Sequence, residues 1–271
     1  MHKILRVEHL KVLIEHKNIK EYLIQDISFY VHTGECLGIL GESGSGKSIA
    51  MKSILGIQDS KLNVQGSALY NNMELIGAGE KLLRKLRGNQ IAMVMQHPMI
   101  AFDPLYRIGY QMIETVRAHK KMKKKEIRSR LIEILNFMSI RHPEDVLKKY
   151  PHQLSGGMLQ RVMIGLALIL EPDMLIADEP TTAIDAVTQY DIIQEFVRLK
   201  QTKKITMVFI SHDLGVIEAV SDRIIVMNKG RIVDEGDYEH IVKHATDPYT
   251  KKLIYTRQQI KGAYEKKVIG A

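Results

Sequence analysis

The feature that most constrains this chain is a glycine-rich segment that follows an apolar run. It reads Gly41, Glu42, Ser43, Gly44, Ser45, Gly46, Lys47, Ser48 and matches the pattern G-x-x-x-x-G-K-[ST] at every fixed position. The preceding run, Cys36–Leu40, is typical of a buried strand, and residues 47–55 predict a helix that stops at Gly56. In this context the glycines turn successive backbone N–H groups toward a phosphate, and the helix N-terminus adds its dipole. We therefore expect this phosphate loop (residues 41–48) to bind a nucleoside triphosphate, with Lys47 at the β- and γ-phosphates and the Ser48 hydroxyl on Mg²⁺.

Composition narrows the class of protein further. With 271 residues, of which 45% are hydrophobic, the chain is long enough for one large α/β domain or for a core with an inserted lobe. The longest apolar stretches, such as residues 163–170, are too short to span a bilayer, and residues 1–10 show no signal-peptide pattern. The single cysteine, Cys36, excludes a disulfide framework, so we expect a reduced, cytosolic compartment.

An excess of basic residues gives the chain a formal net charge of +8. Such an excess suits a nucleic-acid surface and an anionic lipid surface equally well, so the charge alone does not identify a partner. The densest basic cluster, at residues 120–125, is interpreted as the solvated start of a helix.

The rest of the chain divides into β-rich and helical segments. Residues 4–35 contain short β-rich runs with a polar break at residues 16–21, and together with residues 64–70 they predict an antiparallel sheet. From residue 97 to about residue 164 helical periodicity dominates, as in the apolar stripe at residues 127–138. Residues 223–234 predict a closing hairpin that turns at Lys229-Gly230.

Four apolar runs each end on a polar group that can contact a phosphate or its metal ion. The runs cover residues 36–40, 91–95, 174–177 and 206–210, and the groups that follow them are the phosphate loop, Gln96, Asp178-Glu179 and His212. Strands buried on both faces predict a parallel sheet, and ligands of open parallel sheets bind at the carboxyl ends of the strands. We therefore expect these groups to meet at one bound phosphate.

Asp178-Glu179 is interpreted as the acidic partner of the phosphate loop. Asp178 is expected to hold the hydration shell of Mg²⁺, an ion that takes few protein oxygens and keeps several waters. Glu179 can accept a proton from the water that attacks the γ-phosphate. The pair therefore predicts hydrolysis of the bound triphosphate, with Glu179 as the catalytic base.

A second glycine-containing segment lies 24 residues before Asp178. It reads Leu154, Ser155, Gly156, Gly157, Met158. Ser155 is a candidate N-cap, and the two glycines expose backbone N–H groups at the start of a helix, which makes a second anion-binding device. One intramolecular ligand cannot occupy both phosphate sites, so we expect the second site to serve a neighbouring subunit.

These motifs, in this order along the chain, resemble those of the ATP-binding cassette (ABC) ATPases over residues 4 to about 255. The resemblance implies two cassettes paired head to tail, with each ATP held between one phosphate loop and the signature segment (residues 154–158) of the other subunit. It also implies that Gln96 senses Mg²⁺ and the attacking water, that His212 contacts the γ-phosphate in catalysis, and that Asp185 lies at the dimer seam. The expected cofactors are then ATP and Mg²⁺, the metal being bound through Ser48, Gln96 and Asp178.

The same resemblance sets the expected fold. It is an α/β phosphate-loop NTPase (ABC ATPase) core with an N-terminal antiparallel β subdomain and an inserted helical subdomain. We expect the nucleotide-binding core at residues 1–96 and 165–240, the helical subdomain with the signature segment at residues 97–164, and a C-terminal tail at residues 241–271.

Within the superfamily the chain is similar to the peptide/nickel importers. The similarity rests on residues 96–104, 107–109, 151–158 and 247–250. Met158 and Leu159 follow the signature of the nickel-type members, and the chain ends at Ala271 without the cysteine-bearing tail that is common among peptide importers. We therefore expect uptake of nickel or another divalent metal as a metal chelate, with an oligopeptide or dipeptide importer ATPase as the alternative.

The resemblance also implies partners and a location. The expected partners are two integral-membrane permeases, an extracytoplasmic solute-binding protein and a second ABC ATPase, with a heterodimer favoured over a homodimer. The chain is then peripheral at the cytoplasmic face of the cell membrane. A role on nucleic acid or ribosomes is the alternative from another class, but such ABC proteins usually carry long coiled-coil insertions or two cassettes. This chain has neither, so we expect no nucleic-acid partner.

Overall fold

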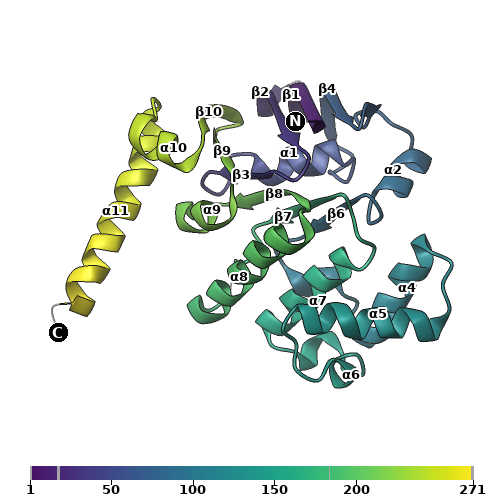
Figure 1. Ribbon diagram of the computed structural model, residues 1–271. Coiled ribbons are helices and arrows are strands. Elements are labelled where there is room, and N and C mark those ends of the chain that lie inside the picture. Colours follow the sequence, from purple (N-terminus) through teal and green to yellow (C-terminus); the bar gives the residue numbers. More distant parts are fainter. Residues whose placement is uncertain (1, 17–18, 183, 270–271) are drawn as a thin grey trace. The chain divides into compact units, whose positions relative to one another are not determined.

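The computed structural model describes residues 2–16, 19–182 and 184–269, which form two compact units (Figure 1). The first unit comprises Met1–Gly77 and Phe209–Ala271, and the second comprises Ala78–Val208. Each unit contains both strands and helices, as the predicted α/β class requires.

An antiparallel sheet with strand order β2-β1-β4-β5 forms the N-terminal part of the first unit. Its strands are β1 (Lys3–His16), β2 (Ile19–His32), β4 (Leu62–Tyr70) and β5 (Met73–Glu74). The predicted antiparallel sheet is therefore confirmed, but the polar break expected at residues 16–21 is wrong for most of its length. Residues 17–18 lie outside the described residues, and the strands continue on both sides of them. Glu15 and Lys20 form an ion pair of 3.1 Å across the hairpin, so these polar residues extend the ladder rather than ending it.

Three further strands belong to the first unit, namely β3 (Cys36–Leu40), β9 (Arg223–Asn228) and β10 (Arg231–Gly236). β3 pairs with β9 in parallel, and β9 pairs with β10 antiparallel. The hairpin predicted around Lys229-Gly230 is confirmed, and both turn residues have positive φ, 47° and 75°, as a two-residue turn of this kind needs. Cys36 is buried in β3, as the apolar run predicts.

The helices of the first unit follow its strands. They are α1 (Lys47–Ile54), α9 (Leu214–Val220), α10 (Tyr238–His244) and α11 (Pro248–Ile269). α1 begins inside the phosphate loop and ends before Gly56, whose φ of 62° is the left-handed conformation of a helix stop. α10 and α11 form the C-terminal end of the unit, drawn in yellow-green and yellow in Figure 1.

The strands of the second unit are β6 (Ile91–Val94), β7 (Met174–Asp178) and the beginning of β8 (Thr206–Ser211), which continues into the first unit. β6 and β7 pair in parallel, with Ile91 opposite Met174, as expected for strands buried on both faces. Every residue of β7 and β8 is buried.

Helices make up most of the second unit. They are α2 (Glu80–Leu86), α3 (Pro98–Ala101), α4 (Ile108–His119), α5 (Lys124–Phe137), α6 (Pro143–Val146), a 3-10 helix (Pro151–Gln153), α7 (Gly156–Leu168) and α8 (Ala186–Lys203). Ile127, Leu131 and Leu135 of α5 are fully buried, so the predicted apolar stripe faces the core. Lys124 and Lys125 are exposed at the start of α5, which confirms the interpretation of that part of the basic cluster.

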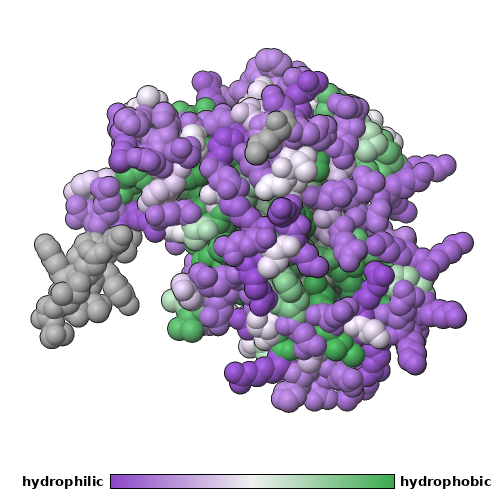
Figure 2. Space-filling view, viewed as in Figure 1, coloured by the Kyte–Doolittle hydropathy of each residue, from purple (hydrophilic) through white to green (hydrophobic). Residues whose placement is uncertain are grey.

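The face shown in Figure 2 is mainly hydrophilic, with hydrophobic side chains in small groups. The core of each unit is built from aliphatic residues together with a few fully buried aromatic rings, such as Tyr70 and Phe209 in the first and Phe196 in the second. In the part of the chain that the structure describes, no helix combines the length and the apolar character needed to cross a bilayer.

Candidate nucleotide-binding site

The phosphate loop connects β3 to α1 in the first unit, as the sequence predicts. Gly46 precedes α1 with a φ of 103°, and a Cβ built there would lie 2.5 Å from Ile24 Cδ1. The backbone conformation therefore favours glycine at this position, and a Cβ would also displace the end of the Ile24 side chain. As a glycine, Gly46 has no side chain that could cap the first N–H groups of α1, which is the arrangement that helix-terminal anion sites use.

Lys47 is the first residue of α1, and its side chain is 96% buried. Its Nζ atom donates hydrogen bonds to the carbonyl oxygens of Gly41 at 2.6 Å and Glu42 at 2.9 Å. The ammonium is thus held by two backbone carbonyl oxygens of the phosphate loop itself. Ser48 follows in the first turn of the same helix.

His212 comes directly after β8 in the first unit and is exposed. The next residue, Asp213, is the N-cap of α9 and accepts a hydrogen bond of 2.7 Å from the backbone N–H of Gly215. His212 therefore occupies a short connection between a buried strand and a capped helix, as its position in the sequence predicts.

The acidic pair lies at the end of β7 in the second unit, with Asp178 2% exposed and Glu179 9% exposed. Gln96 Nε2 donates a hydrogen bond of 3.1 Å to Glu179 Oε2, and Thr182 Oγ1 donates one of 2.9 Å to the same oxygen. The expected proximity of Gln96 and Glu179 is therefore present within this unit. Glu179 also has a φ of 45°, an uncommon backbone conformation for a residue with a Cβ, and such residues cluster at functional sites.

Thr182 is a contact of Glu179 that the sequence reasoning missed. Its position three residues after the acidic pair, in the run that leads to Asp185, is the only sequence signal that points to it. Together Gln96 and Thr182 fix the orientation of the Glu179 carboxylate.

The signature segment forms the start of α7. Ser155 is the N-cap, and its hydroxyl accepts a hydrogen bond of 3.3 Å from the backbone N–H of Met158, as predicted. Gly156 is exposed, and a Cβ built on Gly157 would lie 2.3 Å from Thr188 Cγ2 in the first turn of α8. The beginnings of α7 and α8 are therefore in close contact.

Asp185 is the N-cap of α8 and accepts a hydrogen bond of 3.0 Å from the backbone N–H of Thr188. Hydrogen bonds from the Thr188 backbone and side chain hold the pKa of Asp185 below its ordinary value. The second unit thus places Asp185 beside the signature segment, because Thr188 contacts both. Ala183, in the same connection, lies outside the described residues.

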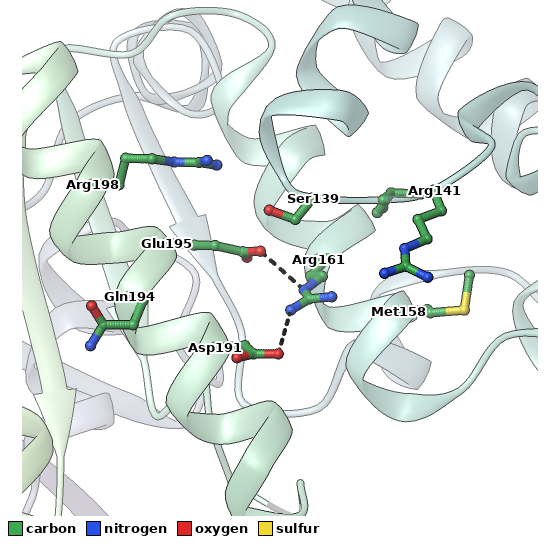
Figure 3. A pocket seen from close by; sticks show the side chains of 9 residues that line it. Ser139, Arg141, Met158, Arg161, Asp191, Gln194, Glu195 and Arg198 are labelled. Atoms are coloured by element: carbon green, nitrogen blue, oxygen red, sulfur yellow. Dashed lines mark hydrogen bonds and ion pairs between the residues drawn. The ribbon is translucent and has the colours of Figure 1, made fainter.

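A cavity of about 660 Å³ lies behind the signature segment, between α7 and α8 (Figure 3). Arg161 of α7 forms ion pairs across it with Asp191 at 3.4 Å and with Glu195 at 3.1 Å, both on α8. Burial raises the pKa of Glu195 to about 7, against the opposing effect of the Arg161 guanidinium. Arg161 is therefore a charged link between the helix of the signature segment and the helix that follows Asp185.

The site residues fall into two sets. The first unit contains the phosphate loop and His212, and the second contains Gln96, Asp178, Glu179, the signature segment and Asp185. Among the described residues, no group of three or more histidine, cysteine, aspartate or glutamate side chains could hold a metal ion. The residues expected to hold Mg²⁺ are Ser48, Gln96 and Asp178, which offer a hydroxyl, a side-chain amide and one carboxylate. This set fits Mg²⁺, because that ion keeps several waters and binds nucleotide phosphates.

A glycine-rich loop between a buried strand and a helix, with a buried acidic pair at the end of another strand, is the arrangement of a phosphate-loop NTPase. The family model described as ABC transporter matches residues 24–182, more than half of the chain, and the chain belongs to this family. The family predicted from the motifs is therefore confirmed.

Individual relatives place the chain more closely. It is 46% identical over 238 residues to the metal-staphylopine import system ATP-binding protein CntD of Staphylococcus aureus (strain NCTC 8325 / PS 47), and the match covers 88% of each chain. It is 40% identical over 256 residues to the dipeptide transport ATP-binding protein DppD of Bacillus subtilis (strain 168), covering 94% of this chain and 76% of the relative.

Among solved structures, a dimeric bacterial ABC transporter cassette, MJ0796, matches with a TM-score of 0.77 and 26% identity, covering 86% of this chain and 98% of the other. The same cassette has been solved bound to ADP and Pi in a post-hydrolysis state, with a TM-score of 0.76. The predicted ABC ATPase fold is therefore confirmed.

Proposed function

We propose that this chain is the ATP-hydrolysing subunit of an importer for nickel or another divalent metal, taken up as a metal chelate. The observation that carries the ATPase role is the hydrogen bond of 3.1 Å between Gln96 and Glu179 at the end of β7. The base and the residue that senses the nucleotide are then in direct contact. The cargo rests on the 46% identity to CntD, whose name gives metal-staphylopine as its substrate.

Catalysis combines binding groups from the two sets of residues. Lys47 and the backbone N–H groups of the phosphate loop hold the β- and γ-phosphates. Ser48, Gln96 and Asp178 would hold Mg²⁺, which would balance charge on the phosphates when bound. Glu179 accepts the proton of the attacking water, and His212 orients the γ-phosphate.

The signature segment is proposed to act on the nucleotide of a second cassette. Ser155 and Gly156 at the start of α7 are exposed, so the N–H groups and the dipole of this helix terminus are accessible to a neighbouring molecule. ATP binding would then close two cassettes head to tail, and hydrolysis would reopen them. Asp185 would lie at the seam. We propose a heterodimer with a related ABC ATPase.

An exposed hydrophobic surface on α3 and the start of α4 suits docking to membrane-embedded permeases. Its members are large side chains with 49% to 78% of their area exposed, namely Met99, Ile100, Leu105, Tyr106 and Tyr110. The surface directly follows Gln96, and the Tyr106 and Tyr110 rings stack at 5.2 Å. We propose that one of the two permeases of the transporter docks here, so that residues 97–164 act as the helical subdomain that transmits the nucleotide state. A solute-binding protein outside the membrane would deliver the cargo, and this chain would be peripheral at the cytoplasmic face.

A dipeptide or oligopeptide importer is the second candidate, favoured by the 40% identity to DppD. Both candidates use the same ATPase mechanism and differ only in cargo. A role on nucleic acid has no comparable support, because the relatives named above are import and transport proteins.

The Glu179→Gln variant tests the ATPase role. It keeps the hydrogen-bonding shape of the side chain but cannot accept the water's proton, so we expect retained ATP binding, a nucleotide-trapped closed dimer and loss of turnover. Steady-state phosphate release and size-exclusion chromatography with ATP are the measurements. Glu133→Gln, on the exposed face of α5, is the matched control and should hydrolyse ATP like the wild type. Wild-type hydrolysis by Glu179→Gln would refute the assignment.

A further inference from the structure

The C-terminal part of the chain contacts the phosphate loop. The backbone N–H of Glu42 donates a hydrogen bond of 2.6 Å to the hydroxyl oxygen of Tyr249, in the first turn of α11. Burial raises the pKa of Tyr249, so its hydroxyl stays neutral and remains an acceptor for the amide. Nothing in the proposed catalytic steps uses this tyrosine.

The bond acts on the same peptide unit that holds the catalytic lysine. The Gly41 carbonyl, which accepts from Lys47 Nζ at 2.6 Å, and the Glu42 N–H belong to one peptide bond. No described peptide bond is cis, and in a trans peptide the C=O and N–H point in opposite directions. Tyr249 and Lys47 therefore hold opposite edges of one peptide plane. While the Tyr249 bond is present, this plane cannot rotate without breaking it.

Tyr249 is itself held in place by short-range hydrogen bonds. Its backbone N–H donates to Asp247 Oδ1 at 2.8 Å. Asp234 of β10 accepts from the backbone N–H of Thr246 at 2.9 Å and from that of Asp247 at 3.3 Å. The approach to α11 is thus fixed to β10, and Tyr249 reaches the phosphate loop from a rigid base.

The same helix also reaches the connection that contains His212. Arg257 Nη1 donates to Asp213 Oδ1 at 2.9 Å, and Arg257 Nη2 donates to Glu218 Oε2 at 3.2 Å. The Arg257 guanidinium lies over Gly215 at the start of α9, where a Cβ would displace the end of the arginine side chain. The C-terminal segment (residues 246–257) therefore contacts both nucleotide-facing connections of the first unit.

We propose that Tyr249 is a positioning residue for ATP binding, and that the C-terminal segment holds the phosphate loop in its binding conformation through the Glu42 amide. The proposal rests on the proposed role of residues 41–48 as the phosphate loop. Tyr249 does not touch the nucleotide. It acts by fixing the peptide plane from which Lys47 moves to the phosphates.

The Tyr249→Phe variant of the full chain tests this proposal, because it removes the hydroxyl and keeps the ring. Loss of one intramolecular hydrogen bond predicts an ATP Kd and KM raised by about three- to tenfold. The kcat should stay within about twofold of wild type, since the transition-state groups are intact. Equilibrium binding of ATP and steady-state phosphate release give these values. A residue needed only for stability would lower the melting temperature without changing KM.

Tyr255→Phe is the matched control, because Tyr255 lies on the same helix and is 63% exposed. It should bind ATP like the wild type.

Lys47→Ala separates this proposal from the function it rests on. If Lys47→Ala binds ATP normally, the proposed phosphate loop itself is wrong. If Lys47→Ala loses ATP and Tyr249→Phe binds it like wild type, only the positioning role is overturned.

A measurement on the wild-type chain tests the bond without any variant. Hydrogen exchange resolved at the Glu42 amide should show protection at least about tenfold above that of an exposed loop amide, because the N–H is bonded to Tyr249. If the Glu42 amide exchanges at the rate of an unprotected amide, the proposal is overturned. Because this measurement uses the wild-type chain, it tests the proposal even if the Tyr249→Phe variant does not fold.

Discussion

Glu195 is a carboxyl group that the catalytic steps do not use, yet it is 94% buried beside the signature helix. The groups that face it are Arg161 of α7, Asp191 and Arg198 of α8, and Ser139 in the connection after α5. Burial raises its pKa to about 7, so its charge changes within the range of ordinary assay buffers. We therefore expect the protonation state of this group, in the link between α7 and α8, to affect stability.

This pKa predicts a pH-dependent stability. The folded chain binds the Glu195 proton more tightly than the unfolded chain does. The stabilisation that this proton gives the folded state is therefore complete below about pH 4.5 and is lost as the pH rises through about 7. We expect the wild type to lose about 3 kcal/mol of unfolding free energy relative to Glu195→Gln as the pH rises from below 4.5 to above 7. Urea unfolding at several pH values is the measurement, with Glu133→Gln as the control. Equal pH dependence in the wild type and Glu195→Gln would contradict the pKa.

Single residues were predictable where a motif fixes their position in an element. The N-cap role of Ser155 and the place of Glu179 after a buried strand follow from local sequence, and both are present. Thr182 and Tyr249 were not predicted, because a hydrogen-bond partner depends on tertiary contacts. Tyr249 is 207 residues away from Glu42, and no spacing rule connects them.

At the scale of elements, the contact between the beginnings of α7 and α8 has the most direct consequence. Gly157 belongs to the signature segment, and Thr188 belongs to the turn that Asp185 caps. The absence of a Cβ at residue 157 lets the two helix starts approach each other. A substitution there therefore changes two motifs at once.

Gly157→Ala should destabilise the chain by about 1–3 kcal/mol, because the new methyl group overlaps the Thr188 methyl group. Thr188→Ser removes that methyl group and keeps the hydroxyl, so the double variant Gly157→Ala/Thr188→Ser should recover most of the loss. Denaturant unfolding of the two single variants and the double variant measures both effects. Gly156→Ala is the matched control, because a Cβ at residue 156 meets no atom within 4 Å. Additive losses in the double variant would show that the two residues do not interact.

Element types were predicted better than element lengths. The hairpin of β9 and β10 was anticipated because Lys229-Gly230 is a strong turn signal between two apolar runs. The C-terminal end of β1 and the N-terminal end of β2 were not anticipated, because polar residues such as Glu15 and Lys20 do not by themselves indicate a strand. Their pairing is stabilised across the hairpin, and alternation within either segment does not reveal it.

At the scale of the whole molecule, the ATPase residues do not distinguish a metal-chelate importer from a peptide importer. The chain is 46% identical to a relative named for the first cargo and 40% identical to one named for the second. Under the proposed function other subunits select the cargo, and a shared ATPase fold does not identify it.

An experiment on the complete transporter should therefore identify the cargo. With permeases, binding protein and second ATPase reconstituted in vesicles, we expect a metal–staphylopine-type chelate to stimulate ATP hydrolysis severalfold, because cargo-loaded receptor would promote closure of the cassettes. Dipeptides should leave the rate at its basal value. Phosphate release with each cargo is the measurement, and the Glu179→Gln transporter is the background control. Stimulation by dipeptides alone would assign the chain to the peptide importers.

The hydrogen bond from Glu42 to Tyr249 also limits how this chain can be shortened or fused to other proteins. A minimal cassette cut after β10 would keep every motif of the nucleotide site but lose the acceptor of the Glu42 amide. We expect such a truncated chain to bind ATP weakly because it lacks Tyr249, although its nucleotide-binding motifs are intact. Affinity tags and fluorescent fusions are therefore best attached beyond Arg257, where neither of these contacts is interrupted.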